Sequence, residues 1–232
     1  MHDERKPAPE SLIPSTPIPE GGEAFFRRVH GLLGGQPKAD ATANQALAVM
    51  DEMLDEIAAG LYSLASMLVG EGEDSIRLVE TAVSRADIPG CGGDAKQARQ
   101  SSRRELCSAA IETLALRNPR SLAAPQEIEP ATTCIEDDDL SAAGISTEEL
   151  ESMLAGPNRE SVRKWLESLS TETRVIFVLR AVAGFSSDEA AALLANHGGP
   201  SASGWTADGV RVTFRQGLCS LASQLIHATN AR

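Results

Sequence analysis

Residues 171–194 read TETRVIFVLRAVAGFSSDEAAALL and predict a sharp bend between two helices. Apolar side chains recur at helical spacing in the first part, and Gly184 stands where a left-handed C-cap ends a helix. Phe185 supplies the apolar contact that accompanies such a cap. Ser186 and Glu189 match a capping box, in which each side chain bonds the backbone amide of the other residue. We therefore expect the second helix to begin almost where the first one ends.

A third helix is predicted after the loop NHGGPSASGW, whose Trp205 is expected to pack into the core. Thr206 is the expected N-cap of this helix, and Asp208 in its first turn favours the helix dipole. Arg211 and Arg215 lie four residues apart and share a face that differs from the buried one. The buried stripe consists of Val210, Phe214, Leu218, Leu221 and Leu225. This order is that of a helix-turn-helix, which predicts DNA binding through Thr206, Asp208, Arg211 and Arg215.

The N-terminal half predicts a tail, a short helix and a helical domain. Residues 1–22 are rich in proline and poor in large apolar groups, which predicts disorder. Residues 23–40 are expected to form a short amphipathic helix and a linker, and that helix packs on its own domain or docks on a partner. Residues 41–118 carry the clearest apolar stripe, which favours a small helical bundle over a coiled coil. The stripe consists of Leu47, Met50, Leu54, Ile57, Leu61, Leu64 and Leu68.

Two further helices are expected after this stripe. Asp74 is the predicted cap of the first. The inward side chains of that helix are predicted to be Ile76, Val79, Val83 and Ala86. The second helix ends at Pro119 and carries a basic row, which either holds DNA phosphates or is a solvated face. This row consists of Lys96, Arg99, Arg103 and Arg104. The predicted buried side chains of the same helix are Leu106, Ala110, Ile111 and Leu114.

Charge is distributed unevenly along the chain, whose formal net charge is -12. Residues 119–160 have the composition of an acidic linker, with helical turns expected around STEELESML. The run EDDD at 136–139 is interpreted as a solvated linker or as a segment that folds back on a basic face and inhibits it. Residues 161–232 carry seven basic and five acidic side chains, so the net charge does not exclude nucleic acid as a ligand.

Motifs for metal binding and catalysis are absent from the sequence. Cysteines are widely spaced and form no CxxC pair, which predicts no metal site and a reduced, cytoplasmic protein. His197 and His227 are interpreted as residues without a role. No apolar run approaches the about 20 residues that span a bilayer, so we predict a soluble protein without membrane contact. Phosphate loops, nucleophile elbows, HExxH motifs and paired carboxylates are also missing. We therefore predict no catalytic residue, no cofactor and no enzyme.

Residues 166–225 resemble the fourth conserved region of bacterial RNA polymerase sigma factors of the extracytoplasmic-function type. The residues that carry the resemblance are Leu166, Leu169, Arg174 to Leu179, Gly184-Phe185-Ser186, Glu189-Ala190-Ala191, Leu194 and the run WTADGVRVTFRQGLCSLASQL. Residues 68–86, LVGEGEDSIRLVETAVSRA, resemble the second region of the family. The resemblance implies RNA polymerase core and promoter double-stranded DNA as partners, and an anti-sigma protein as a further one. It implies polymerase docking through Asp74, Leu78, Val79 and Glu80.

The expected architecture is all-α, with two small helical domains, 41–118 and 161–232, joined by the acidic linker 119–160. The leading prediction is a sigma-factor-like transcription initiation protein that binds RNA polymerase core and promoter DNA. The alternative is a sigma-like helix-turn-helix regulator, or a helical protein-interaction module, that has lost promoter opening. Residues 87–120 contain no aromatic side chain on which an opened base would stack, which favours the alternative. Additional phosphate contacts are expected from Arg163, Lys164, Arg174 or Arg180.

Overall fold

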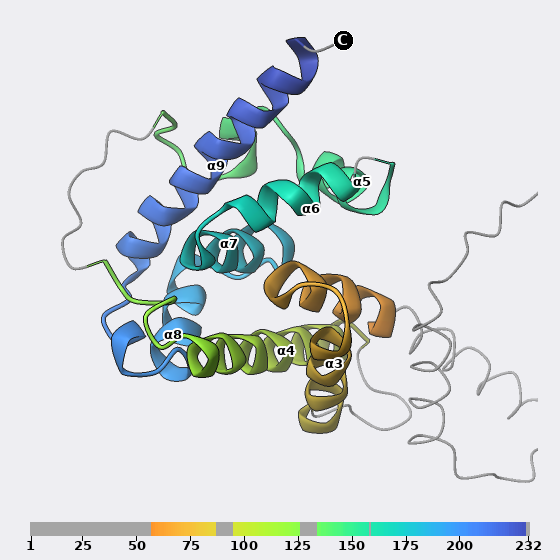
Figure 1. Ribbon diagram of the computed structural model, residues 1–232, viewed down its shortest axis with the longest axis vertical. Helices are drawn as coiled ribbons and strands as arrows, with labels where there is room; N and C mark the ends of the chain where they lie inside the picture. The colour runs from red at the N-terminus through yellow and green to blue at the C-terminus, as the bar shows by residue number, and fades with distance from the viewer. Residues whose placement is uncertain (1–56, 87–94, 126–133, 158, 231–232) are drawn as a thin grey trace, which may run out of the picture. The chain divides into compact units, whose positions relative to one another are not determined.

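The computed structural model describes residues 57–86, 95–125, 134–157 and 159–230. All of them belong to one compact unit, residues 39–232. Within these ranges every regular element is a helix and no strand occurs, so the predicted all-α class is confirmed (Figure 1). The tail, the helix expected at 23–40 and the first half of the apolar stripe lie outside the described residues. The disorder predicted for 1–22 also stays a prediction.

The described part of the apolar stripe forms a helix over residues 57–69. Leu61, Leu64 and Leu68 are buried there, as predicted from their spacing. Helix α3 (Glu73–Arg85) follows after a tight turn in which Gly70 and Gly72 have positive φ values of 92° and 124°. Glycine adopts this backbone conformation readily, so the two glycines allow the chain to change direction within a few residues.

Two predictions for α3 are wrong. Its N-cap is Gly72, without a side-chain cap, and Asp74 lies inside the first turn. Asp74 instead forms an ion pair with Arg117 at 2.6 Å. The buried face of α3 also differs from the predicted one, and only Val79 belongs to both. The buried side chains are Ser75, Leu78, Val79 and Ala82. The Ser75 hydroxyl donates to the Gly70 carbonyl, and this bond brings a polar residue onto the buried face.

Helix α4 (Ala95–Arg117) packs against α3 and ends before Pro119, as predicted. Its expected buried face is confirmed at Leu106, Ala110, Ile111 and Leu114. The predicted linker contains the short 3-10 helix η1 (Leu140–Ala143) and helix α5 (Thr147–Ala155). The capping box expected at Ser146 and Glu149 is present. The segment has the composition of a linker, yet it forms a helix where a capping box and an apolar residue, Leu150, are present.

Helices α6 (Arg159–Ser168) and α7 (Thr171–Phe177) lead into the predicted bend. Between α7 and the bend lies a π-helical turn, η2 (Val178–Val182), which the sequence pattern did not predict. Its last bond joins the Ala183 amide to the Val178 carbonyl, five residues back, whereas the bonds of an α-helix join residues four apart. Gly184 then has a φ of 78°, and Phe185 is buried at 3% exposure. The predicted left-handed cap is confirmed.

Helix α8 (Ser187–His197) begins with the predicted capping box of Ser186 and Glu189. The connection to α9 (Ala207–Asn230) contains a short 3-10 helix, η3 (Pro200–Ala202). Thr206 caps α9, because its hydroxyl accepts from the Gly209 amide at 3.1 Å. Trp205 packs into the core as expected, and its Nε1 donates to the Leu122 carbonyl at 2.9 Å. The predicted stripe of α9 is buried at Val210, Phe214, Leu218 and Leu221 and half-buried at Leu225.

Aromatic contacts form the centre of the core under α9. The rings of Trp165 and Phe177 meet edge to face at 4.9 Å, and the rings of Phe177 and Phe214 lie 5.7 Å apart. These contacts hold α6, α7 and α9 together. Helix α8 packs against α9 on one side and against α4 on another. The two predicted domains therefore contact each other through α4 and α8, and the boundary between them stays a prediction.

Candidate nucleic-acid interface

The face of α9 that lies away from the core carries Arg211, Arg215 and Cys219 in one line. Each is four residues from the next, and this spacing brings side chains onto one face of a helix. Both arginine side chains are half-buried. Thr206 and Asp208 lie exposed at the start of the same helix, and Asp208 forms an ion pair with Arg211. The sequence-predicted DNA-binding residues of α9 are therefore neighbours in the structure.

Residues 134–139, CIEDDD, cover this face, and we call them the acidic strap. A disulfide joins Cys134 to Cys219, with 5.8 Å between their Cα atoms. The Glu136 carbonyl accepts from Nη1 of Arg215 at 2.9 Å. The Asp138 carboxylate lies 3.8 Å from Nε of Arg211. Contacts with α9 thus run backward along the helix as the strap runs forward, so the two segments are antiparallel.

The spacing of these contacts matches the dimensions of both segments. Two strap residues in extended conformation span about 6.6 Å, and four helical residues rise about 6.0 Å. Cys134, Glu136 and Asp138 therefore meet Cys219, Arg215 and Arg211 in that order. Ile135, one of the residues in between, is buried at 8% exposure. The acidic strap thus follows the basic line of α9 in register.

Arg180 on η2 completes the basic surface. Its Nη2 donates to the Asp138 carbonyl at 3.0 Å and lies 3.3 Å from the Asp138 carboxylate. Its Nη1 donates to the Phe185 carbonyl at 3.2 Å, and its guanidinium carbon lies 5.1 Å from the centre of the Phe214 ring. Arg180 therefore joins the bend, α9 and the strap. We call Arg180, Arg211 and Arg215 the arginine cluster.

The strap corrects two expectations from the sequence. The interpretation of EDDD as a solvated linker is wrong for Asp138, whose half-buried side chain contacts Arg180 and Arg211. Glu136 is exposed and contacts Arg215 through its backbone carbonyl. The alternative interpretation, a segment folded back on a basic face, describes these contacts. The prediction of reduced cysteines is wrong for Cys134 and Cys219, which form a disulfide. Their separation of 85 residues contains no information about their distance in space.

The predicted basic row of α4 divides into two parts. Lys96, Arg99 and Arg103 are exposed. Arg104 instead contacts α8, because its Nη2 lies 2.7 Å from the Glu189 carboxylate and its guanidinium carbon lies 5.4 Å from the centre of the Phe185 ring. The Ser186 amide, the Ser186 hydroxyl and Arg104 lower the pKa of Glu189 despite the opposing effect of burial. Arg104 thus stabilises the cap of α8.

A second contact between α4 and α8 involves His197, which was interpreted as having no role. Nδ1 of His197 lies 2.9 Å from the carboxylate of Glu112, and Arg85 lies 3.4 Å from the same group. Burial raises the pKa of Glu112, but hydrogen bonds from His197 and Arg85 outweigh it, so the pKa is lowered. The interpretation of His197 is therefore wrong, because this residue joins α8 to α4.

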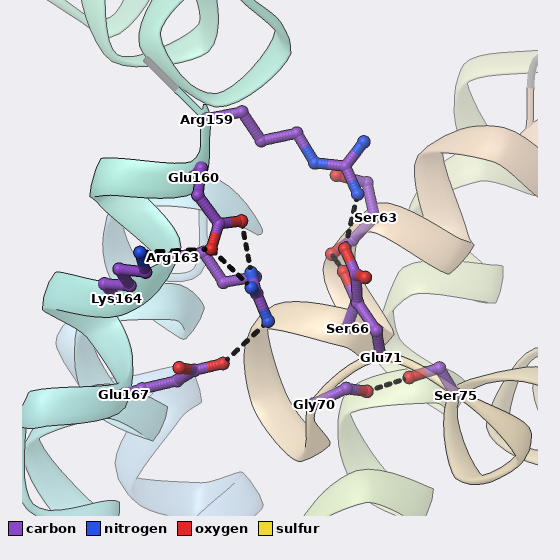
Figure 2. A network of polar contacts seen from close by, with 10 residues as sticks. All are labelled: Ser63, Ser66, Gly70, Glu71, Ser75, Arg159, Glu160, Arg163, Lys164 and Glu167. Atoms are coloured by element: carbon purple, nitrogen blue, oxygen red, sulfur yellow. Dashed lines mark hydrogen bonds and ion pairs between the residues drawn. The ribbon is translucent and has the colours of Figure 1, made fainter. Parts of the chain in front are cut away.

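The additional cations expected on α6 belong to an internal charge network (Figure 2). Arg163 bonds Glu160 at 2.7 Å and Glu167 at 3.1 Å, and Lys164 lies 3.7 Å from Glu160. Nearby, Arg159 joins α6 to Glu71 in the turn before α3 at 2.6 Å. Arg163 and Lys164 thus pair with acidic side chains of α6 itself, whereas Arg211 and Arg215 lie on α9, the second helix of the predicted helix-turn-helix.

The residues that the resemblance assigns to polymerase docking differ in exposure. Leu78 and Val79 are buried at 4% and 0% exposure and belong to the core between α3 and α4. Asp74 is exposed and pairs with Arg117, and Glu80 is half-buried. A docking partner would therefore meet Asp74 and Glu80 but not the two apolar side chains. Polymerase docking through α3 stays a prediction.

Other candidate sites in the described ranges offer little chemistry. A pocket of about 200 Å³ lies between the helix over 57–69, α5 and η2, and its charged lining residues are Arg103 and Glu151. Burial raises the pKa of the Cys107 thiol to about 12, although Arg103 and Arg104 act in the opposite direction. That thiol is thus protonated at neutral pH and is a poor nucleophile.

Metal clusters and membrane-spanning helices are both missing from the part of the chain that the structure describes. It contains no group of three or more His, Cys, Asp or Glu side chains placed to hold a metal ion. Nor does a helix in that part combine the length and the apolar character needed to cross a bilayer. The arginine cluster and its strap are therefore the surface on which a functional argument can be built.

No protein-family model, curated protein or solved structure matches this chain. The sigma-factor resemblance consequently rests on the residues quoted above. The features that bear on function are the geometry of α8, α9 and the strap.

Sequence reasoning missed the central residues of the strap contact. Asp138 was treated only as part of a charge run, and Arg180 only as one of several additional cations. Two features of the sequence agree with the disulfide, although neither predicts it. Cys219 continues the four-residue repeat of Arg211 and Arg215, and Cys134 stands just before the acidic run. Opposite charges beside two cysteines on separate segments are compatible with pairing of those segments.

Proposed function

We propose that this chain is a sigma-factor-like transcription initiation protein that binds RNA polymerase core and promoter double-stranded DNA. The observation that carries the proposal is the pair α8 and α9, which pack together and are capped by Ser186 and Thr206. In a helix-turn-helix, the second helix of such a pair enters the major groove. The connection is longer than the usual turn of about four residues, and η3 and Trp205 fix its path.

The chemistry of the arginine cluster supports DNA as the ligand. Guanidinium groups bind carboxylates and phosphates in the same forked geometry. A surface that holds an acidic strap therefore also suits the phosphates of a DNA backbone. About three phosphate contacts give weak binding with a shallow dependence on salt. The protein thus needs a partner that adds DNA affinity, and RNA polymerase core has that role in the proposal. An anti-sigma protein and a cytoplasmic location belong to the same proposal.

A second candidate function is a sigma-like regulator that binds DNA but does not open promoters. Two observations favour it. Leu78 and Val79 are buried and cannot contact polymerase in this conformation. Residues 87–120 contain no aromatic side chain, whereas an opened base needs a stacking platform worth about 1–3 kcal/mol. Both candidates use the same face of α9, so they differ in their dependence on polymerase.

A transcription experiment tests the proposal. The reduced full-length chain is mixed with purified bacterial RNA polymerase core and a library of random duplexes placed upstream of a transcribed reporter. Sequencing of the run-off transcripts identifies any duplex that the chain selects. The control is the variant Arg211→Gln with Arg215→Gln, which keeps two of the three methylene groups of each arginine stem. We expect transcripts that require the chain and fall at least about tenfold in the variant, which corresponds to about 1.4 kcal/mol.

Each outcome distinguishes the candidates. Transcripts that depend on the chain and on both arginines support the sigma-like function. Selection of particular duplexes without polymerase, and without transcripts, supports the regulator instead. If the chain gives no transcripts and selects no DNA, both functions are overturned.

A further inference from the structure

We propose that the Cys134–Cys219 disulfide is a redox switch that holds the acidic strap over the arginine cluster, and that its reduction opens this surface to nucleic acid. The inference rests on the proposed function, because it names the regulation of the same surface. The disulfide lies at the end of the line formed by Arg211 and Arg215. It thus fixes the register in which the strap meets α9.

The strap is attached to α9 at both of its ends. At Cys134 the attachment is the disulfide. After Asp139 the chain enters η1, which packs against α9 (Figure 1). Asp139 also caps η1, since its carboxylate accepts from the Ala142 amide at 3.2 Å. Reduction removes only the first attachment, so the strap stays connected to the protein and can return.

Of the contacts between the two attachments, the one between Arg180 and Asp138 is the most buried, since the Arg180 side chain is 18% exposed, and the others are weak. The Asp138 carboxylate is 39% exposed, and Arg211 is 42% exposed. Partly exposed ion pairs of this kind contribute little in water, and salt screens them further. Arg215 contacts a carbonyl of the strap instead of a carboxylate. Without the disulfide, these contacts compete poorly with the many phosphates of a DNA duplex.

The strap also leaves part of the arginine cluster unsatisfied. Among the described residues, the Nε atoms of Arg180 and Arg215 are buried and have no hydrogen-bond partner. A buried donor without an acceptor opposes the folded arrangement. The covered state therefore depends on the covalent link more than on complementary bonding. Such dependence is what a switch requires, because loss of one bond then changes the state.

The redox step needs a dithiol reductant. A thiolate of the reductant attacks a cystine sulfur and forms a mixed disulfide, and its second thiol then displaces the remaining protein sulfur. Cys134 and Cys219 each become a thiol, and the reductant becomes a disulfide, so two electrons and two protons reach the protein. Cys134 is exposed, which gives the reductant access. In a cytoplasmic protein, a disulfide is commonly transient and redox-sensing.

The switch can be tested without DNA by the reactivity of arginine side chains. The oxidised and the dithiothreitol-reduced full-length chain are treated with phenylglyoxal, and modified residues are located by mass spectrometry. We expect Arg215 and Arg211 to be modified at least about threefold faster after reduction. Arg163 is the internal control, because its partners Glu160 and Glu167 lie outside the strap. The double variant Cys134→Ser with Cys219→Ser is expected to react like the reduced protein under both conditions.

Binding of a fluorescent random-sequence duplex at low salt is the second readout. Oxidised protein is expected to bind at least about fivefold more weakly than reduced protein. In oxidised protein, Asp138→Asn is expected to recover part of that loss, because it removes the carboxylate charge that Arg180 and Arg211 face, while the bond of Arg180 to the backbone carbonyl stays. Asp137→Asn is the matched control. It removes the same charge from an exposed strap residue and is expected to recover less.

The two readouts separate the switch from the proposed function. Faster arginine modification together with tighter DNA binding after reduction supports both. Faster modification with no DNA binding in either state supports the switch and overturns DNA binding. Equal modification of Arg211 and Arg215 in the oxidised and the reduced protein overturns the switch, whatever the DNA result.

Discussion

Asp138 holds the strap against two of the three arginines in the cluster. Its carboxylate lies between Arg180 on η2 and Arg211 on α9. A mildly basic segment of the sequence thus becomes a covered surface in the fold. The helix-capping bonds join close neighbours in the sequence. The roles of Ser186, Glu189 and Thr206 were predictable because each acts on a backbone amide within three residues.

Gly184 provides a stability prediction. Its φ of 78° lies in the left-handed region, where a Cβ atom costs roughly 1–2 kcal/mol. Gly184→Ala is therefore expected to lower the free energy of unfolding by about that amount in urea denaturation. Gly60→Ala is the control, because Gly60 is exposed in the helix over 57–69 and a Cβ there meets nothing within 4 Å. That substitution is expected to raise stability by about 0.5–1 kcal/mol. Equal effects of both substitutions would contradict the bend geometry.

Helix α4 contacts α8 through two polar side-chain contacts that no periodicity argument predicted. Arg104 bonds Glu189 at the start of α8, and Glu112 bonds His197 at its end. Each pair joins residues 85 positions apart. Amphipathic spacing correctly identified the buried faces of α4 and α9, since those follow from helix geometry. It did not indicate which exposed side chains of one helix meet those of another, because that depends on the tertiary packing.

The carboxylates in these two contacts predict a loss of stability in acid. The folded state lowers the pKa of both Glu112 and Glu189. A carboxyl group of this kind stabilises the fold above its unfolded pKa of about 4.3, and this contribution is lost as the pH falls through the folded pKa. We expect urea denaturation to show a decline in stability below about pH 4.3. The variant Glu112→Gln with Glu189→Gln is expected to be less stable at pH 7 and to decline less on acidification.

The control for this experiment is Glu151→Gln, which changes an exposed carboxylate on α5. Its stability is expected to follow the unmodified protein across the same pH range. If the double variant and the unmodified protein lost stability in parallel on acidification, the two carboxylates would not be the cause.

Charge in this protein is organised by the fold rather than by the sequence alone. The chain carries a formal net charge of -12, yet its arginine cluster forms a concentrated basic surface on η2 and α9. The acidic strap covers that surface and is attached to it by a disulfide. The helical class and the bend at Gly184 were predictable because they depend on local patterns. The covered surface was not predictable, because it joins residues from η2, the strap and α9.

The salt dependence of DNA binding tests the central claim most directly. Binding of the reduced chain to a random-sequence duplex is measured at several salt concentrations, and the logarithm of the affinity is plotted against the logarithm of the salt concentration. Each phosphate contact contributes about 0.9 to the slope of this plot. Arg211→Gln with Arg215→Gln is therefore expected to reduce the slope by about 1.8, whereas Lys164→Gln, on the internal network of α6, is expected to leave it unchanged. An unchanged slope in the double arginine variant, or no binding by the reduced chain, would contradict the claim that the arginine cluster binds DNA.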